Sequence, residues 1–329
     1  MFSSAIEIHD LKKSFKTKNK IVEAVRGISL SVRRGEIYGF LGPNGAGKTT
    51  CQRMLTTLLP IDGGFAVVAG YDVRKEARKV RERIGYVGQA GGADLPATGR
   101  ENMMLAGRLY GMTKSDVERK IAELSRLLEI DELLDRIVRT YSGGQKRRLE
   151  IALGIIHEPE VLFMDEPTTG LDLQNRANLW AHIHELKEKG MTIFLTTHYL
   201  EEADALADRL SIIDHGRIVA EGTPRELKRQ ISGDAVVLKL KSEKDAQAAL
   251  HLMEKREFVS EAGIDGLTVC LYVADGPKIL PALFDTLKEN TIELDTVSLS
   301  APSLNDVFLK KTGKLLRDTG REDTYEDSD

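Results

Sequence analysis

The sequence predicts an α/β domain built on a mostly parallel sheet, followed by a smaller α+β domain. Two observations support this prediction. Over the first two-thirds of the 329-residue chain, strand-length apolar segments alternate with helical segments, a pattern typical of a parallel sheet covered by helices. Beyond Gly233 the order becomes strand, helix, strand, strand, helix, strand, which matches a ferredoxin-like unit.

Three short apolar runs predict the central strands of the first domain, because each is bounded by turn or charge signals. They are Ile37–Leu41, Val161–Met164 and Met191–Thr196. The segment Asp214–Arg217 lies between two further apolar runs and predicts a hairpin turn.

The second domain is predicted from periodicity and from helix-start signals. Thr223 and Pro224 with Glu226 predict the start of a helix that ends near Ser232 and Gly233. Apolar residues then predict, in order, the strand Val236–Leu240, the helix Lys244–Lys255, two strands joined at Asp265–Gly266, the helix Pro277–Asn290, the strand Glu293–Leu299 and a closing helix Ser303–Lys311. We expect a first domain over residues 1–232, with a helical insert at about 96–156, and an accessory domain over 233–311. Residues 312–329 are expected to be a disordered acidic tail.

Composition excludes several classes of protein. The chain has 47 Lys and Arg against 51 Asp and Glu, a net charge of −4, whereas a dedicated nucleic-acid binder usually has a basic excess. No run approaches the roughly 18 apolar residues of a membrane span, and the first residues lack the pattern of a signal peptide. The two cysteines, Cys51 and Cys270, have no metal-ligand or disulfide spacing. We expect a reduced, cytosolic chain with no nucleic-acid partner.

The segment Gly42–Thr49 fits the phosphate-loop pattern G-x-x-x-x-G-K-[ST] and lies between a predicted strand and a helix. Its glycines let backbone N–H groups turn toward an anion, and the helix N-terminus adds its dipole. Lys48 can reach the β- and γ-phosphates, while the Thr49 hydroxyl can ligate Mg²⁺. We therefore predict an ATP contact at each of Gly42, Pro43, Asn44, Gly45, Ala46, Gly47, Lys48, Thr49 and Thr50.

Two acidic residues, Asp165 and Glu166, follow the buried strand Val161–Met164. Open α/β sheets bind ligands at the carboxyl ends of their strands. One carboxylate can hold Mg²⁺, and the next points the other way and can address water. Together with the phosphate loop, this pair predicts a phosphoryl-transfer site.

The stretch Ser142-Gly143-Gly144-Gln145 predicts a second helix start that exposes backbone N–H groups. It is either a second anion site or an ordinary capped helix.

These motifs together resemble the nucleotide-binding subunits of ABC transporters, with every marker present once and in family order. Besides the phosphate loop, the acidic pair and the signature Ser142–Gln145, Gln89 matches the Q-loop glutamine and Asp172 the D-loop aspartate. His198 matches the switch histidine, and Phe15 lies where the family places an aromatic that stacks on adenine. On residue type alone, His198 could be a satisfied buried histidine and Phe15 a core residue.

The resemblance implies a fold, an activity and partners. It implies a P-loop NTPase domain of the ABC type, with a mixed sheet, that hydrolyses ATP with Mg²⁺ held by Thr49, Gln89 and Asp165. Glu166, His198, Lys48 and Gln89 take the catalytic roles. The single signature implies a homodimer with two ATP molecules between the subunits. An integral-membrane permease is the implied second partner, at the cytoplasmic face of the membrane.

The segments Thr98–Asn102, Gly107–Gly111 and Pro302–Leu309 narrow the resemblance to drug-export ATPases of the daunorubicin/doxorubicin-resistance type. Export of a drug-like or hydrophobic compound is therefore the expected function. The alternatives are a soluble ABC ATPase acting on nucleic acid or ribosomes, and an ABC ATPase for another substrate such as a lipid or a polysaccharide.

Overall fold

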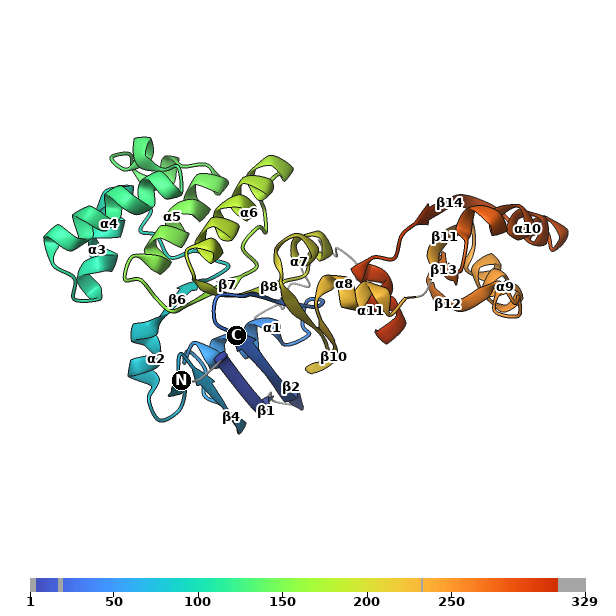
Figure 1. The fold of residues 1–329 in the computed structure, drawn as a ribbon, viewed down its shortest axis with the longest axis horizontal. Helices are drawn as coiled ribbons and strands as arrows, with labels where there is room; N and C mark the ends of the chain where they lie inside the picture. Colours follow the sequence, from blue (N-terminus) through green and yellow to red (C-terminus); the bar gives the residue numbers. More distant parts are fainter. Residues whose placement is uncertain (1–3, 17–19, 232, 313–329) are drawn as a thin grey trace. The chain divides into compact units, whose positions relative to one another are not determined.

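The computed structural model describes residues 4–16, 20–231 and 233–312. The chain separates into two compact units, residues 1–218 and 219–329 (Figure 1). The sequence analysis places the domain boundary after residue 232 instead, and that division stays a prediction. Ser232 and residues 313–329 of the predicted tail lie outside the described residues. Thr312, expected to be the first residue of that tail, is instead the last residue of a helix.

The first unit carries a six-stranded sheet in the order β10-β9-β3-β8-β7-β6, and its edge strand β10 begins in this unit and ends beyond residue 218. Strand β3 pairs in parallel with β8 and β9, and β7 pairs in parallel with β8 and β6. The predicted mostly parallel sheet is therefore confirmed. Its strands are β3 (Ile37–Leu41), β6 (Ile84–Val87), β7 (Val161–Asp165), β8 (Thr192–Thr197), β9 (Arg209–Asp214) and β10 (Arg217–Gly222).

A second, antiparallel sheet was not predicted strand by strand. Its order is β2-β1-β4-β5, and the long hairpin of β1 and β2 forms most of it. The strands are β1 (Ser4–Lys16), β2 (Ile21–Arg33), β4 (Gly63–Val68) and β5 (Tyr71–Asp72).

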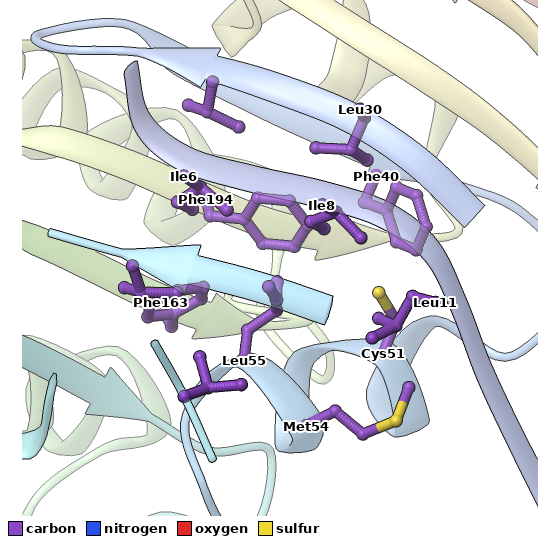
Figure 2. Close-up of a cluster of buried hydrophobic side chains, with 14 of the residues drawn as sticks. Ile6, Ile8, Leu11, Leu30, Phe40, Cys51, Met54, Leu55, Phe163 and Phe194 are labelled. Atoms are coloured by element: carbon purple, nitrogen blue, oxygen red, sulfur yellow. The ribbon is translucent and has the colours of Figure 1, made fainter. Parts of the chain in front are cut away.

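Side-chain alternation in the central strands divides the core of this unit in two. Phe40, Phe163 and Phe194 point to the face covered by the antiparallel sheet and helix α1, where they pack with Met54 and Leu55 (Figure 2). Their neighbours Leu162 and Leu195, among others, point to the opposite face and pack with α5 and α6. Both faces are dry, because the side chains named here are at most 1% exposed. Truncating such a phenylalanine to alanine typically costs about 3–5 kcal/mol.

Helices surround the six-stranded sheet, and three of them lie between β6 and β7 in the chain (Figure 1). The helices of this unit are α1 (Lys48–Leu55), α2 (Ala77–Arg83), α3 (Gly99–Leu109), α4 (Lys114–Leu127), α5 (Gly143–Ile155), α6 (Leu173–Glu188) and α7 (Leu200–Leu206). Two 3₁₀ turns, Asp131–Leu133 and Val138–Thr140, connect α4 to α5.

The second unit contains the predicted strand-helix-strand-strand-helix-strand order. Its sheet is antiparallel, in the order β12-β13-β11-β14, which confirms the ferredoxin-like arrangement. The elements are α8 (Pro224–Arg229), β11 (Asp234–Leu240), α9 (Glu243–Met253), β12 (Val259–Asp265), β13 (Thr268–Val273), α10 (Gly276–Glu289), β14 (Leu294–Ser300) and α11 (Leu304–Thr312). Helix α8 ends three residues before the predicted end near Ser232.

None of the helices within the described ranges combines the length and apolar composition that a membrane crossing requires.

Candidate functional site

The phosphate-loop segment joins β3 to α1 and depends on glycine for steric reasons. A Cβ on Gly42 would lie 2.3 Å from the carbonyl oxygen of Ile213. Gly47 has φ +104°, and a Cβ there would lie 2.3 Å from the carbonyl oxygen of Ala24. At Gly45, by contrast, an added Cβ would meet nothing within 4 Å. The loop is therefore held tightly from behind by β9 and β2 and is open in front.

In front of the loop lies a pocket of about 320 Å³. Gly47 is the N-cap of α1 and provides no side-chain cap, so the first backbone N–H groups of α1 are left for a ligand. The residues that line the pocket are Ala24, Asn44, Gly45, Gly47, Lys48, Thr49, Thr50, Gln89 and Glu166.

Lys48 is the buried cation of this pocket. Its Nζ donates hydrogen bonds to the carbonyl oxygens of Gly42 (2.8 Å) and Pro43 (3.1 Å). Glu166 Oε1 lies 3.4 Å from the same nitrogen. Burial lowers the pKa of Lys48, and the negative charge of Glu166 opposes that shift.

The two carboxylates at the end of β7 make different contacts. Asp165 Oδ1 accepts hydrogen bonds from Thr49 Oγ1 (3.2 Å) and from Thr196 Oγ1. The next residue, Glu166, has φ +46°, in the left-handed region that non-glycine residues seldom adopt. Its backbone N–H donates to the carbonyl oxygen of Thr196 at 3.1 Å. Asp165 is thus directed at the Thr49 hydroxyl, and Glu166 is turned away from the strand toward the pocket.

Three side chains converge on the Glu166 carboxylate besides Lys48. His198 Nδ1 lies 3.1 Å from Oε1. Gln89 Nε2 and Thr169 Oγ1 donate to Oε2 at 3.4 and 3.3 Å. Burial alone would raise the pKa of Glu166, but the hydrogen bond from His198 and the charges of Lys48 and His198 together lower it. Glu166 is therefore ionised at neutral pH and can accept a proton.

The signature segment lies at the start of α5 and has its own cap. Ser142 Oγ accepts a hydrogen bond from the Gln145 N–H, and Gln145 Oε1 accepts one from the Ser142 N–H, which forms a capping box. Ser142 and Gly143 are exposed, whereas Gly144 is buried against Asn175, whose Oδ1 would lie 2.5 Å from an added Cβ. Asp172 caps α6 by accepting a hydrogen bond from the Asn175 N–H at 2.8 Å.

The structure therefore brings the predicted residues together in two groups. The phosphate loop, Gln89, Asp165, Glu166 and His198 form one, and the signature and Asp172 form the other beside Asn175. Among the described residues, no member of the second group lines the pocket in front of Lys48. Phe15 is on β1, 39% exposed, and also does not line that pocket. Its exposure excludes the core-packing alternative.

Sequence reasoning missed three residues of the site. Thr196 binds both Asp165 and the backbone of Glu166, and Thr169 binds the Glu166 carboxylate. Arg147 is buried and donates to three backbone carbonyl groups around the site. Both threonines lie close in sequence to the motifs identified above, but only the fold brings them to Asp165 and Glu166.

The residues present fit a nucleotide carrying Mg²⁺. The glycine loop and the uncapped helix α1 offer backbone donors, and Lys48 offers a cation, as phosphate groups require. The oxygen atoms of Thr49, Asp165 and Gln89 are of the type that Mg²⁺ prefers.

Comparisons with known proteins agree with this chemistry. The family model described as "ABC transporter" matches residues 25–169, and the model described as "ATP-binding protein DrrA1-3-like, C-terminal domain" matches residues 222–312. The daunorubicin resistance ATP-binding protein DrrA3 of Streptomyces coeruleorubidus is 42% identical over 95% of this chain and 97% of that protein. The linearmycin resistance ATP-binding protein LnrL of Bacillus subtilis is 35% identical over 95% of this chain and 100% of that protein.

A solved structure of the ATP-binding subunit of an ABC transporter is similar to the chain with a TM-score of 0.61. Its sequence is 28% identical, and the match covers 69% of this chain and 93% of the other.

Proposed function

The chain belongs to the ATP-binding proteins of ABC transporters, and from this membership we propose that it powers export of a drug-like or hydrophobic compound through a separate membrane permease. It is an ATPase that binds ATP with Mg²⁺. One observation supports hydrolysis by this chain above all others. An ionised, buried Glu166 is held between Lys48, His198 and Gln89 at the edge of the phosphate pocket.

The polar residues in and around the pocket take roles that follow from their chemistry. Lys48 and the N–H groups of α1 bind the phosphate oxygens, and Thr49, Asp165 and Gln89 hold the ion. Bound MgATP supplies the phosphoryl bond that is hydrolysed. Glu166 orients the attacking water and accepts its proton, and His198, which lies against Glu166, contacts the γ-phosphate. Phe15, on the hairpin that also carries Ala24, stacks on the adenine.

The signature segment acts on the pocket of a second copy. Ser142 and Gly143 are exposed at a helix N-terminus, and that end carries a partial positive charge suited to an anion. A two-fold homodimer presents each signature to the pocket of the other copy with a single self-complementary interface.

The permease docks in a groove of about 340 Å³ beside the Q-loop. Leu58, Tyr110, Gly88, Gly91 and Gly92 contribute to it, and Leu58 and Tyr110 are 60% and 46% exposed. Large exposed apolar side chains around a groove mark a binding surface. We propose a cytoplasmic segment of the permease as the occupant, which places the chain at the cytoplasmic face of the membrane.

The class of exported compound rests on the relatives. Two of them are named for resistance to daunorubicin and to linearmycin.

We propose that residues 1–232 form the ATPase domain and that residues 233–311 form an accessory domain.

The first test is the solution mass of the Glu166→Gln variant by light scattering, with MgATP and after nucleotide removal. A mass that doubles only with MgATP is the expected result, because the variant binds nucleotide without hydrolysing it. A monomer under both conditions would contradict the two-copy site.

Coexpression with the permease then tests docking. The chain should co-purify with membranes, and Tyr110→Asp should release it.

A further inference from the structure

Arg147 lies two residues after the signature, on α5, and is only 7% exposed. Its guanidinium group makes four interactions. Nε donates to the carbonyl oxygen of Pro167 at 2.8 Å, and Nη2 donates to that of Asp165 at 3.1 Å. Nη1 donates to the carbonyl oxygen of Gly88 at 2.7 Å and to Glu150 Oε2 at 3.0 Å. One side chain thus joins α5 to two separate loops.

The first loop carries Glu166. The two carbonyl groups that Arg147 binds there belong to the residues on either side of Glu166. Glu166 itself has φ +46°, and a non-glycine residue keeps such a backbone only where its surroundings fix it. Arg147 supplies that restraint, because its planar fork presents donors in fixed directions.

The second loop carries Gln89, which directly follows the bound carbonyl group of Gly88. Glu150, the ion-pair partner of Arg147, reaches the other end of this loop. A Cβ on Gly91 would lie 2.1 Å from Glu150 Oε1. Helix α5 also touches β6 closely, since a Cβ on Gly85 would lie 2.2 Å from the carbonyl oxygen of Gly154. Side chains of α5 therefore contact the Q-loop at both Gly88 and Gly91.

We propose that Arg147 is a positioning residue for hydrolysis, which holds the backbone of Glu166 and the Q-loop in one fixed relation to the signature helix. With Glu150 it also reaches the groove beside the Q-loop, because Gly88, Gly91 and Glu150 line that groove. A displacement in the groove thus moves the water-activating carboxylate through one guanidinium group. This inference rests on the role of Glu166 in the proposed function.

The test compares Arg147→Lys and Arg147→Ala with Arg148→Ala. Arg148 is the matched control, because it is the next residue on the same helix. It binds the carbonyl oxygens of Leu128 and Glu129, away from both loops. We expect kcat for ATP to fall at least tenfold in both Arg147 variants, with KM changed less than threefold, because Arg147 makes no contact with the phosphate loop among its four interactions. Arg148→Ala should keep kcat within threefold.

Guanidinium ion provides a readout that a merely structural role would not give. The Arg147→Ala variant leaves three carbonyl groups facing a space of guanidinium shape. Added guanidinium chloride at a few tens of millimolar should raise its kcat at least fivefold, whereas sodium chloride at equal ionic strength should not. The wild type should not respond. Absence of rescue, or a kcat within twofold of wild type in Arg147→Lys, would overturn the proposal.

Hydrogen exchange keeps the proposal testable if the isolated chain turns over slowly. In Arg147→Lys, exchange should rise in residues 86–92 and 165–169 but not in residues 42–50. Equal exchange in all three segments would also overturn the proposal. The Glu166→Gln variant, assayed in parallel, separates the proposed role of Glu166 from the positioning role of Arg147. If that variant keeps its turnover, the assigned role of Glu166 fails, whatever Arg147 does.

Discussion

Helices α1 and α5 both start at a glycine-containing motif, and their starts are built differently. Helix α1 starts at Gly47 without a side-chain cap, above a buried Lys48 and beside Glu166. Helix α5 starts at Ser142, which closes a capping box with Gln145. The start of α1 therefore keeps its backbone N–H groups for a ligand and has the cation Lys48 close by. The start of α5 is stabilised by its own capping box and is exposed. In the proposed homodimer, each phosphate site combines the start of α1 from one copy with the start of α5 from the other.

The largest expected effect is on kcat, and it comes from Glu166, the carboxylate beside the start of α1. Replacing Glu166 by Gln removes the proton acceptor but keeps the size and the hydrogen-bonding oxygen of the side chain. We expect kcat to fall by roughly 10²–10⁴-fold, the contribution typical of a general base, while nucleotide binding persists. Steady-state hydrolysis and nucleotide-binding titrations measure the two quantities. Loss of both together would mean that Glu166 holds the ligand rather than activates water.

Mixing variants tests whether the two starts act on each other across copies. Lys48→Met disables the pocket, and Gly144→Asp disables the signature by placing a bulky anion where Asn175 leaves no room. Each homodimer should lose about 10²–10³-fold in kcat, as when one oxyanion donor is removed.

An equal mixture should regain up to about a quarter of the wild-type rate, because half of the dimers then contain one intact site. A mixture no faster than the mean of the two variants would contradict a site shared between copies. The control is Lys48→Met mixed with Glu166→Gln, which restores no intact pocket.

A pH effect on stability should come from a buried carboxyl group outside the phosphate pocket. Glu202 on α7 is fully buried and accepts a hydrogen bond from Trp180 Nε1 at 3.4 Å. Burial raises its pKa, and the nearby hydroxyl groups of Thr197 and Thr168 oppose the shift without cancelling it. The native state therefore holds this proton at pH values where the unfolded chain has released it. The stability that Glu202 contributes is complete below its unfolded pKa of about 4.3 and declines as the pH rises.

Glu202→Gln should match the wild type near pH 4 and exceed it at pH 8 by about 1–3 kcal/mol, the cost of an uncompensated buried polar group. Denaturant unfolding at both pH values measures the difference. A gain that is equal at both pH values would contradict the role of ionisation. Gln174→Ala, an exposed change at the start of α6, is the control and should show no dependence on pH.

The sequence predicted the parts of the site that depend on local backbone geometry. The glycine loop and the strand end at Asp165 are such parts, because neighbouring residues alone determine whether N–H groups or carboxylates reach the sheet edge. The ferredoxin-like order beyond Gly233 was predicted for the same reason, since helix periodicity and turn residues are local signals.

Contacts between distant segments could not be predicted in this way. In the sequence, nothing distinguishes Arg147 from the other basic residues after the signature. Only the packing of α5 against β6 and β7 brings it to Gly88 and Pro167. The antiparallel sheet was equally hidden, because the pairing of β1 with β4 spans more than 50 residues and leaves no local pattern. The position of Phe15 relative to the adenine stays a prediction.

The smallest expected effect concerns the cap of the second helix start. Ser142→Ala removes the hydroxyl that accepts the Gln145 N–H but leaves Gly143 and Gly144 in place. Losing such a cap costs about 1 kcal/mol, so the free energy of unfolding should fall by that amount. Ser142→Asp should restore it, because Asp also caps helices well. The two variants should nevertheless differ in activity. Ser142→Asp brings a negative charge to the proposed phosphate contact, so it should hydrolyse ATP more slowly than Ser142→Ala despite its greater stability. If both variants instead follow stability alone, the signature acts only as a helix cap, and the complementarity between the two starts does not hold.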